Sequence, residues 1–463
     1  MSISQEKILD SKVLQLTAQL SKNETTERDF VELLNFYFRN GRPKYFSKYK
    51  DDLLRVFPEV LDTMPIENMF EAAHDLFLFA RTSNDTLGDR ENQDEINRSI
   101  FQPFQKKLAE MLPYIEVKKL TFVPKPDTYV ILTRHASTKG MYAPGKFIYS
   151  VCKSLLKENK CVILCHLGSI DEAFHNLKIH EKFTIYHCKG STIDIFFTLR
   201  KIIQDAQPLE VLTEIELSVI NLIEAIGVSS KVSLLSAGVF KTPWFDKKYL
   251  VTELYQDEDK TDQNLVPIPQ VHSKELLAPE CSAEALRKLK QEYDLDNKFV
   301  IGSFARYEKF TPEFLSLAKR CLTRIQNSVL ILAGSNDQSR VVDFFSDEIN
   351  RGKVIVLGVV NTNIFGWMID VFLEPFPVVA GFAALESLAK GKPVFTLECA
   401  GLGNYVASRD ADLVFQSQTE LVAKMSSVVK STEEYRALSQ KSLEIAETFY
   451  DDKALALSII YSS

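Results

Sequence analysis

The sequence lacks any run of about 18 apolar residues, the length that a membrane-spanning helix needs. Its first residues also lack the charged and then apolar layout of a secretory signal peptide. An excess of positive charge is missing too, because 55 Lys and Arg stand against 62 Asp and Glu. Duplex binding rests on clustered cations. We therefore expect a cytoplasmic protein with no transmembrane segment and no nucleic-acid partner.

Cysteine is present but is not arranged for metal or disulfide chemistry. The seven cysteines are an odd number, they lie one at a time, and no CxxC pair or Cys/His cluster at zinc spacing occurs. We interpret them as buried thiols of a reducing compartment, and we predict no metal site. The apolar share of 45% excludes a mainly disordered protein.

Hydrophobic periodicity divides the chain into one helical part and two alternating parts. Residues 1–122 show helical spacing and are predicted to form an all-α domain. In residues 128–275 and 282–440, short apolar runs alternate with amphipathic stretches, which predicts βαβ units and a parallel sheet in each. The polar, proline-containing segment 257–280 is predicted to be the linker between them. The predicted strands are 129–132, 161–165, 183–186, 211–212, 232–235, 299–303, 329–333, 354–357, 371–373 and 394–397.

The loop after residues 299–303 carries the first candidate site. A buried strand ends at Ser303, the loop contributes Arg306 and Lys309, and a helix begins near Thr311 with Pro312 at its first position. Cations and free backbone N–H groups at the carboxyl end of a strand suit a diphosphate. An ordinary solvated loop is the alternative interpretation.

The stretch 370–394 carries the second candidate site. A strand runs through a proline-rich loop into a helix whose first turn is built of small residues, including Gly381 and Ala383. Small side chains let a phosphate approach the backbone amides. Glu386 follows about one turn later and could accept hydrogen bonds from ribose hydroxyls. Helix packing and a solvated face are the alternatives.

Together, these stretches resemble the nucleotide-sugar half of GT-B glycosyltransferases. The similarity is to the clan of the bacterial cytoplasmic glycosyltransferases of adhesin proteins and the O-linked N-acetylglucosamine transferases. There a Phe-x-x-x-x-Lys-x-x-Pro loop supplies a lysine to the donor diphosphate, and Phe304, Lys309 and Pro312 match it. A Pro-Phe-Pro run before a helix with a ribose-binding carboxylate looks like residues 375–377 and Glu386.

The chain departs from these enzymes at the start of the second helix. The bacterial enzymes carry Thr and Asn there, where this chain has Gly381 and Phe382. Retaining GT-B enzymes have two glutamates separated by seven residues, but Val378 stands at the first of these positions. The departures leave a second function open, a non-catalytic GT-B adaptor or chaperone for a partner glycosyltransferase. A GT-B sugar-nucleotide epimerase ranks lower, because its donor motifs are not evident.

The resemblance implies two Rossmann-like domains behind the all-α domain, with residues 441–463 forming a helix that crosses back to the first sheet domain. It implies transfer of a hexosyl or N-acetylhexosaminyl group from a nucleotide sugar, with UDP expected, to a protein or glycan acceptor. No metal or other cofactor is required, because cations and a helix dipole stabilise the diphosphate. The expected donor-binding residues are Ser303, Arg306, Lys309, Gly358, Val359, Gly381, Phe382, Ala383 and Glu386, and Lys309 is also predicted to be catalytic.

The acceptor side offers a histidine after the first predicted strand of the first sheet. His135 is predicted to be the general base, because the pKa of imidazole lies near working pH. His166 after the next strand is the alternative base, and Glu214 and Glu216 are further carboxylate candidates. A structural role is the other interpretation of either histidine. The all-α domain could offer a surface to a protein partner.

Overall fold

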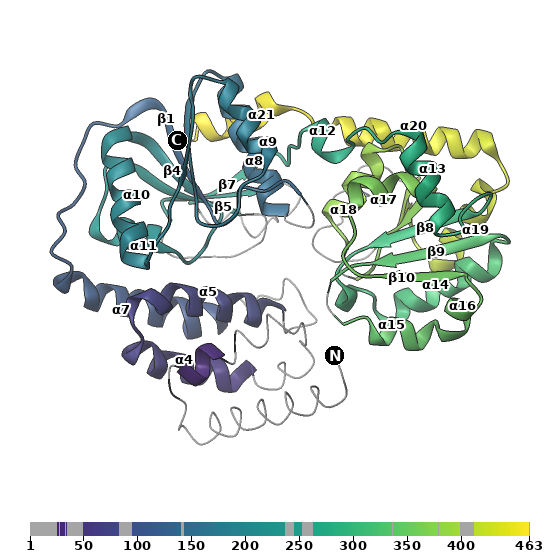
Figure 1. The fold of residues 1–463 in the computed structure, drawn as a ribbon, viewed down its shortest axis with the longest axis horizontal. Coiled ribbons are helices and arrows are strands. Elements are labelled where there is room, and N and C mark those ends of the chain that lie inside the picture. Colours follow the sequence, from purple (N-terminus) through teal and green to yellow (C-terminus); the bar gives the residue numbers. More distant parts are fainter. Residues whose placement is uncertain are drawn as a thin grey trace.

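Two parallel β-sheets flanked by helices carry most of the described chain (Figure 1). The structure is a computed structural model that describes residues 26, 28–32, 34, 50–82, 95–139, 143–236, 245–251, 263–335, 337–377, 379–398 and 412–462. Within these residues no helix combines the length and apolar character that crossing a membrane requires. The expected α/β class with helices ahead of two parallel sheets is confirmed.

The helical part precedes the sheets and lies beneath the first of them in Figure 1. Its described elements are α4 (Lys50–Thr63), α5 (Ile66–Thr82), η2 (Asn97–Phe101), α7 (Gln102–Met111) and η3 (Leu112–Tyr114). Aromatic rings join these helices, since Phe70 meets Phe104 edge-on at 5.2 Å between ring centroids and Phe77 lies 5.5 Å from Phe101. The Oγ1 of Thr192 donates to the carbonyl of Glu67 in α5, which ties this part to the first sheet domain.

The first sheet has seven parallel strands in the order β3-β2-β1-β4-β5-β6-β7. The strands are β1 (Lys125–Thr133), β2 (Cys161–His166), β3 (Phe183–His187), β4 (Pro208–Thr213), β5 (Lys231–Ser236), β6 (Lys247–Val251) and β7 (Leu265–Ile268). Between them lie α8 (Ala143–Lys157), α9 (Glu172–Asn176), η4 (Leu177–Ile179), α10 (Thr192–Ala206) and α11 (Val219–Ile226). Its central strands β1 and β4 end in continuous buried runs because helices cover the sheet.

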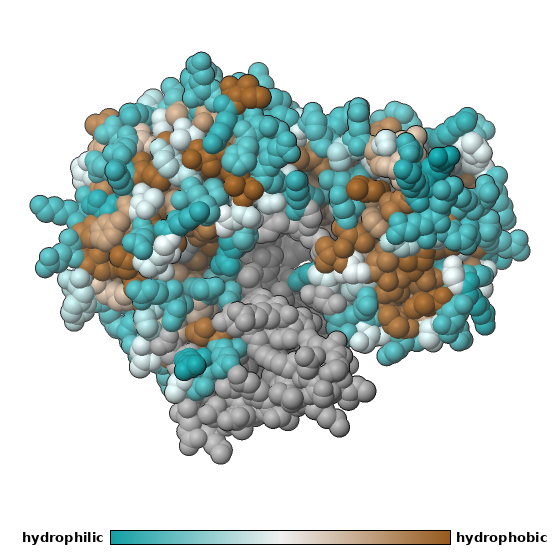
Figure 2. Space-filling model, in the orientation of Figure 1, coloured by the Kyte–Doolittle hydropathy of each residue, from teal (hydrophilic) through white to brown (hydrophobic). Residues whose placement is uncertain are grey.

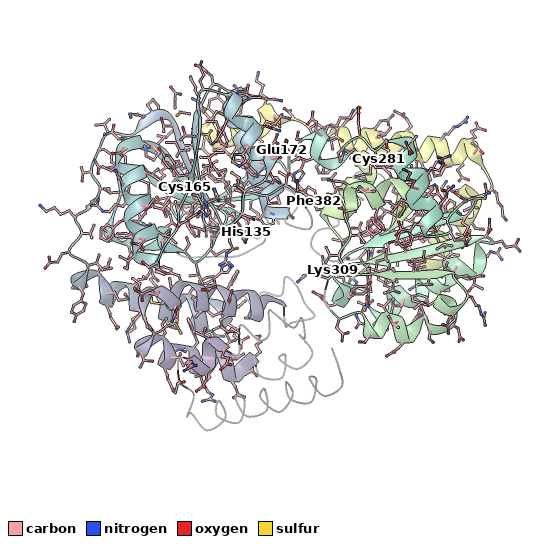
Figure 3. All side chains as sticks on the ribbon, viewed as in Figure 1. His135, Cys165, Glu172, Cys281, Lys309 and Phe382 are labelled. Atoms are coloured by element: carbon pink, nitrogen blue, oxygen red, sulfur yellow. The ribbon has the colours of Figure 1, made fainter. Side chains whose placement is uncertain are left out.

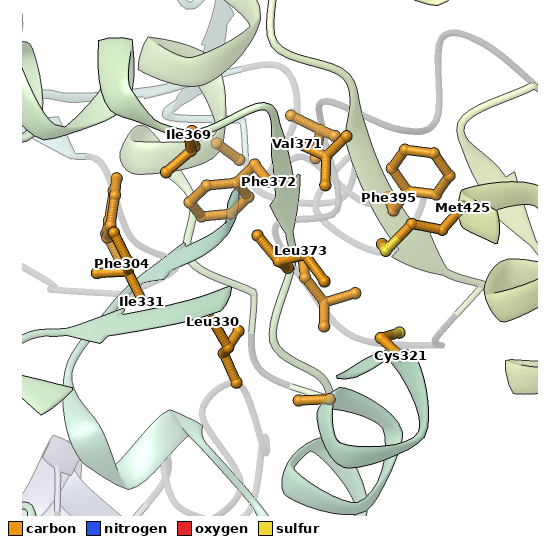
Figure 4. Close-up of a cluster of buried hydrophobic side chains, with 14 of the residues drawn as sticks. Phe304, Cys321, Leu330, Ile331, Ile369, Val371, Phe372, Leu373, Phe395 and Met425 are labelled. Carbon is orange, nitrogen blue, oxygen red and sulfur yellow. The ribbon is translucent and has the colours of Figure 1, made fainter. Parts of the chain in front are cut away.

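The second sheet has six parallel strands in the order β10-β9-β8-β11-β12-β13. The strands are β8 (Phe299–Phe304), β9 (Ser328–Ala333), β10 (Val354–Leu357), β11 (Val371–Leu373), β12 (Val394–Leu397) and β13 (Val414–Phe415). Its helices are α13 (Ala283–Glu292), η7 (Tyr307–Lys309), α14 (Pro312–Arg324), α15 (Ser339–Phe344), α16 (Ser346–Asn350), α17 (Thr362–Met368), α18 (Phe382–Ala389), α19 (Gln418–Val428) and α20 (Thr432–Glu447). Figure 4 shows the core beside β8 and β11, where Phe304 meets Phe372 edge-on. On the surface of this domain, to the right in Figure 2, hydrophobic residues gather among hydrophilic ones.

Two connections join the sheet domains, and both differ from the sequence prediction. The predicted linker 257–280 contains β7 as well as α12 (Lys274–Leu277). Pro267 is compatible with β7 because this strand lies at the sheet edge. The single helix expected over residues 441–463 is divided between the end of α20 and α21 (Asp452–Ile460). The side chains of Leu455 and Ile459 in α21 are fully buried in the core of the first sheet domain, so the chain returns there.

Candidate active site

In each sheet the strand order reverses beside the strand that comes first in the chain. The reversal lies between β1 and β4 in the first sheet and between β8 and β11 in the second. Open parallel sheets bind ligands outside the carboxyl ends of the strands at such a point. Figure 3 shows His135 and Lys309, which follow β1 and β8, on the facing sides of the two domains. The predicted site residues therefore flank both reversal points.

The loop after β8 brings Lys309 to the loop after β11. The Lys309 Nζ donates to the carbonyl oxygen of Val379 at 2.7 Å. Thr311 caps α14 as predicted, accepting from the N–H of Phe314, and its Oγ1 donates to the carbonyl of Phe376 at 3.1 Å. Because β8 and β11 are neighbours in the sheet, two motifs about 70 residues apart in sequence meet at one point.

Two other predicted residues, Ser303 at the end of β8 and Arg306 in the loop after it, differ in their surroundings. The Ser303 side chain is fully buried, and among the described residues its Oγ has no hydrogen-bond partner. The Arg306 guanidinium pairs with Glu308 at 3.1 Å within the same loop. Lys309 therefore reaches the loop after β11, whereas Arg306 forms its ion pair within its own loop.

A carboxyl group that was not predicted as part of the site lies between these loops. Glu374 directly follows β11, is almost fully buried, and accepts from the backbone N–H groups of Gly381 and Ala380. Burial raises the pKa of Glu374 to about 8, although these N–H groups and the charge of Lys309 act in the opposite direction. Its Oε2 has no partner in the described part of the chain. The sequence signal that could have identified Glu374 is an acidic residue directly after a predicted buried strand.

The start of α18 holds three of the predicted donor-binding residues. Gly381 is the N-cap with φ of 72°, a left-handed conformation that favours glycine. Phe382 and Ala383 follow in the first turn, where backbone N–H groups have no partner within the helix. Glu374 already binds the N–H of Gly381. Phe382 places an aromatic ring where the resemblance leads one to expect a small polar side chain.

Glu386 faces the first sheet domain. Its carboxylate forms an ion pair with the Nζ of Lys146 in α8, and each side chain is only 3% exposed. The Lys146 Nζ also lies 4.6 Å from the centre of the Phe382 ring. Lys146 was not predicted, because no local pattern marks a lysine near the start of an amphipathic helix as a partner for a residue 240 positions away.

The loop after β10, which packs against the loop after β9, contains Gly358 and Val359, two of the residues predicted to bind the donor. The Tyr307 hydroxyl donates to the carbonyl of Leu357 at 2.6 Å, and the N–H of Gly334 donates to the carbonyl of Gly358 at 3.2 Å. A Cβ at Gly334 would lie 1.7 Å from the carbonyl oxygen of Ala305, so only glycine fits. The neighbouring Val359 is 61% exposed. These hydrogen bonds fix the backbone next to Val359, whose exposed side chain is accessible to a ligand.

His135 sits at the reversal point of the first sheet. Its Nδ1 accepts from the backbone N–H of Ser169 at 3.2 Å, so the hydrogen of the neutral ring lies on Nε2. Burial, with a smaller effect of the Arg134 charge, lowers the pKa of His135. A Cβ at Gly168 would lie 2.3 Å from Nδ1, which makes glycine necessary for this packing.

Two of the other acceptor-side candidates, Glu214 and His166, contact the loops that hold His135. Glu214 at the end of β4 accepts from the Arg134 N–H at 2.9 Å and from the Thr133 hydroxyl at 2.8 Å. The Nδ1 of His166 lies 2.8 Å from the Gly168 carbonyl, and its ring stacks on His187 at 4.4 Å. His166 therefore supports the loop against which His135 packs. The remaining candidate, Glu216, is buried.

The helical part reaches the same region. Burial, with a smaller effect of Arg134, lowers the pKa of His74 in α5 to about 3. The neighbouring Asp75 has its pKa raised to about 6 by burial, while Arg134 acts in the opposite direction. These effects place α5 near the carboxyl end of β1. Among the described residues, no three His, Cys, Asp or Glu side chains gather as a metal ion would require.

Comparison with known proteins gives structural matches only. No family model matches the sequence, and neither does any curated protein. A solved glycosyltransferase from Rickettsia africae matches 73% of this chain and 98% of its own, with a TM-score of 0.56 and 14% identity. An O-GlcNAc transferase variant from Thermobaculum terrenum matches 98% of this chain and 97% of its own, with a TM-score of 0.56 and 13% identity.

A third solved structure carries a ligand. Anabaena HepE, solved with UDP and glucose, matches 72% of this chain and 98% of its own, with a TM-score of 0.54 and 13% identity. The chain has the GT-B fold. The match to the Thermobaculum protein extends over nearly the whole chain, so it includes helices ahead of the two GT-B sheets. At these identities the similarity concerns the fold.

Proposed function

We propose that this GT-B chain is a glycosyltransferase that takes a hexosyl or N-acetylhexosaminyl group from a nucleoside diphosphate sugar. UDP is the proposed nucleotide, a choice supported by the solved HepE complex with UDP and glucose. The acceptor is a protein or a glycan, as the resemblance to the adhesin glycosyltransferases and O-linked N-acetylglucosamine transferases suggests. The reaction requires no metal in this proposal.

The donor would bind where the loops after β8 and β11 meet. Lys309 and Arg306 would stabilise the diphosphate as it leaves, together with the first-turn N–H groups of α18. Glu386 would accept hydrogen bonds from the ribose, which requires it to release Lys146. The backbone of Gly358 and the exposed side chain of Val359 would contact the base.

The acceptor would bind at the end of β1, between the first sheet and α5. His135 is the proposed general base for the acceptor. Its lone pair lies on Nδ1, where the Ser169 N–H binds, so proton uptake requires the ring to leave Ser169. The charge of Glu214 favours the protonated ring. In this arrangement Ser169 positions the ring, and burial and the Arg134 charge lower the pKa of His135 more than the Glu214 charge raises it.

The observation that carries the proposal is the contact of Lys309 with the loop after β11. In Lys309→Ala we expect UDP to lose most of its stabilising effect on the melting temperature, since a ligand that binds only the folded state raises stability. Lys353→Ala, at an exposed lysine of the same domain, should keep the full effect. Sugar transfer should fall by more than about tenfold in the Lys309 variant alone.

Three results would count against the proposal. An unchanged melting temperature of the unaltered protein in the presence of UDP and of other nucleoside diphosphates would show that the donor site does not exist. Retained turnover in Lys309→Ala would remove the role of that lysine. Binding of UDP with neither transfer nor hydrolysis of any sugar nucleotide would identify a non-catalytic adaptor instead.

A further inference from the structure

A buried ion pair joins the two sheet domains beside the proposed donor site. Lys146 lies near the start of α8 in the first domain, and its ammonium group reaches Glu386 in α18 of the second domain. The same ammonium lies 4.6 Å from the centre of the Phe382 ring, at the first residue of α18. Figure 3 shows Phe382 on the side of the second domain that faces the first. Lys146 is thus held over the N-terminus of α18.

The surroundings of this pair hold more positive than negative charge. Lys390, which is also buried, donates from its Nζ to the backbone carbonyl of Glu386 at 3.1 Å. Burial lowers the pKa of Lys390 to about 8, so at pH 7 it is mainly charged and adds a second positive charge near the Glu386 carboxylate. The ring of His272 packs edge-on against Phe382 at 4.6 Å between centroids, and burial together with the charge of Lys146 keeps it neutral. A buried excess of positive charge favours an anionic ligand.

The buried carboxyl group on the other side of α18 adds no balancing charge at neutral pH. Burial raises the pKa of Glu374 to about 8, so this group is mainly neutral at pH 7. Lys309 stands on this side, and Lys146 stands over Phe382 on the other. The start of α18 therefore lies between cations that come from both domains.

We propose that Lys146 binds the donor diphosphate from the first domain, exchanging its contact with Glu386 for a phosphate oxygen when a nucleotide enters. This inference rests on the proposed function and adds a residue to it. A nucleoside diphosphate carries both replacement partners, because its ribose hydroxyls can donate to Glu386 and its phosphates can accept from Lys146. After the exchange both buried charges still have partners. A buried charge without a partner would destabilise the complex.

The exchange predicts that the phosphate groups, rather than the nucleoside, depend on Lys146. Removing the ammonium should cost UDP a charge-assisted contact. The affinity for uridine should not fall, because uridine has no phosphate. It should rise, because Glu386 no longer binds a lysine and is available to the ribose. The ratio of the two affinities separates a phosphate ligand from a residue that only shapes the site.

The experiment is calorimetric titration of UDP and of uridine into the unaltered protein, Lys146→Met, Lys146→Arg and Lys153→Met. Lys153 is the matched control, since it lies on α8 but bonds to Ser273 and Glu275. We expect Lys146→Met to bind UDP about tenfold more weakly or worse while binding uridine at least as well. The Arg variant and the control should keep UDP affinity within a few fold.

Two outcomes would overturn the role of Lys146 while leaving the donor site in place. These are equal or tighter binding of UDP by Lys146→Met, and an equal loss of UDP and uridine. Should the single variant fail to fold, Lys146→Met combined with Glu386→Gln removes both charges and is compared with Glu386→Gln alone. Failure of the unaltered protein to bind UDP would instead overturn the proposed function and this inference with it.

Discussion

At the scale of single residues, Glu374 shows how burial sets the charge of the site. The carboxyl group lies directly after β11, beside Lys309, and its folded-state pKa of about 8 lies above the ordinary value of 4.5. Between these two pH values the folded chain holds a proton that the unfolded chain has released. Stability should therefore fall as pH rises through this range and level off above pH 8.

Glu374→Gln tests this, because an amide resembles the protonated carboxyl group in shape. We expect the variant to fold, and its free energy of unfolding should fall less between pH 5 and pH 8.5 than that of the unaltered protein, because the amide cannot ionise. Urea unfolding at several pH values measures both slopes. Parallel slopes would show that the Glu374 carboxylate is ionised at pH 7.

The sequence predicted residues of the site only where a local pattern marks them. Lys309 could be predicted because a strand end, a cation and a capped helix follow each other within a dozen positions. Lys146 could not, because its partner is defined only by how two domains meet. The tautomer of His135 could not be predicted either, because it depends on the N–H of Ser169 in another loop.

At the scale of elements, the N-cap of α14 joins the loops after β8 and β11, where the donor is proposed to bind. The Thr311 hydroxyl oxygen accepts from the Phe314 N–H and donates its hydrogen to the Phe376 carbonyl. Thr311→Ala removes the cap and this link together. We expect a loss of about 1 to 2 kcal/mol in the free energy of unfolding, and weaker UDP binding because the loop after β11 loses an anchor.

Ser316→Ala is a suitable control for this prediction. Ser316 lies on the same helix and is exposed, and its hydroxyl donates to the carbonyl of Pro312 rather than to the loop after β11. Denaturant unfolding and UDP titration should both leave it close to the unaltered protein. Equal effects of the two substitutions would mean that the Phe376 contact contributes nothing to the donor site.

Strand prediction succeeded for the centre of each sheet and failed at one edge of each. The central strands are long apolar runs, such as β1 and β9. At the edges, β6 begins with two lysines, β7 contains Pro267, and β13 has only two residues. Such strands lack the alternation or continuous apolar character that marks a strand in a sequence, and the pairing of neighbouring strands defines them instead.

At the scale of the whole molecule, His272 lies where the two sheet domains meet. Its backbone N–H donates to the carbonyl of Phe449 at 2.8 Å, and its ring packs on Phe382. Burial, with a smaller effect of Lys146, lowers the pKa of His272 to about 3. The unfolded chain takes up a proton near the ordinary value of 6.5, so stability should be lost as pH falls from there towards 3.

The whole-molecule prediction compares the unaltered protein with His272→Gln. Other groups also weaken the fold in acid, so the change between pH 7 and pH 4.5 is measured for both proteins by urea unfolding. We expect the free energy of unfolding to fall less in the variant, because glutamine has no charge to acquire. An identical fall would mean that protonation of His272 does not oppose folding.

The return of α21 to the first domain has a consequence for how the protein is made. Leu455 and Ile459 fill the core beside α8, and they leave the ribosome only after the whole second domain has been synthesised. Until then the apolar face of α8 that they cover is open to solvent. We therefore expect the core of the first domain to remain incomplete until the second domain has been synthesised. A nascent chain stalled before α21 should bind chaperones that recognise exposed apolar helices.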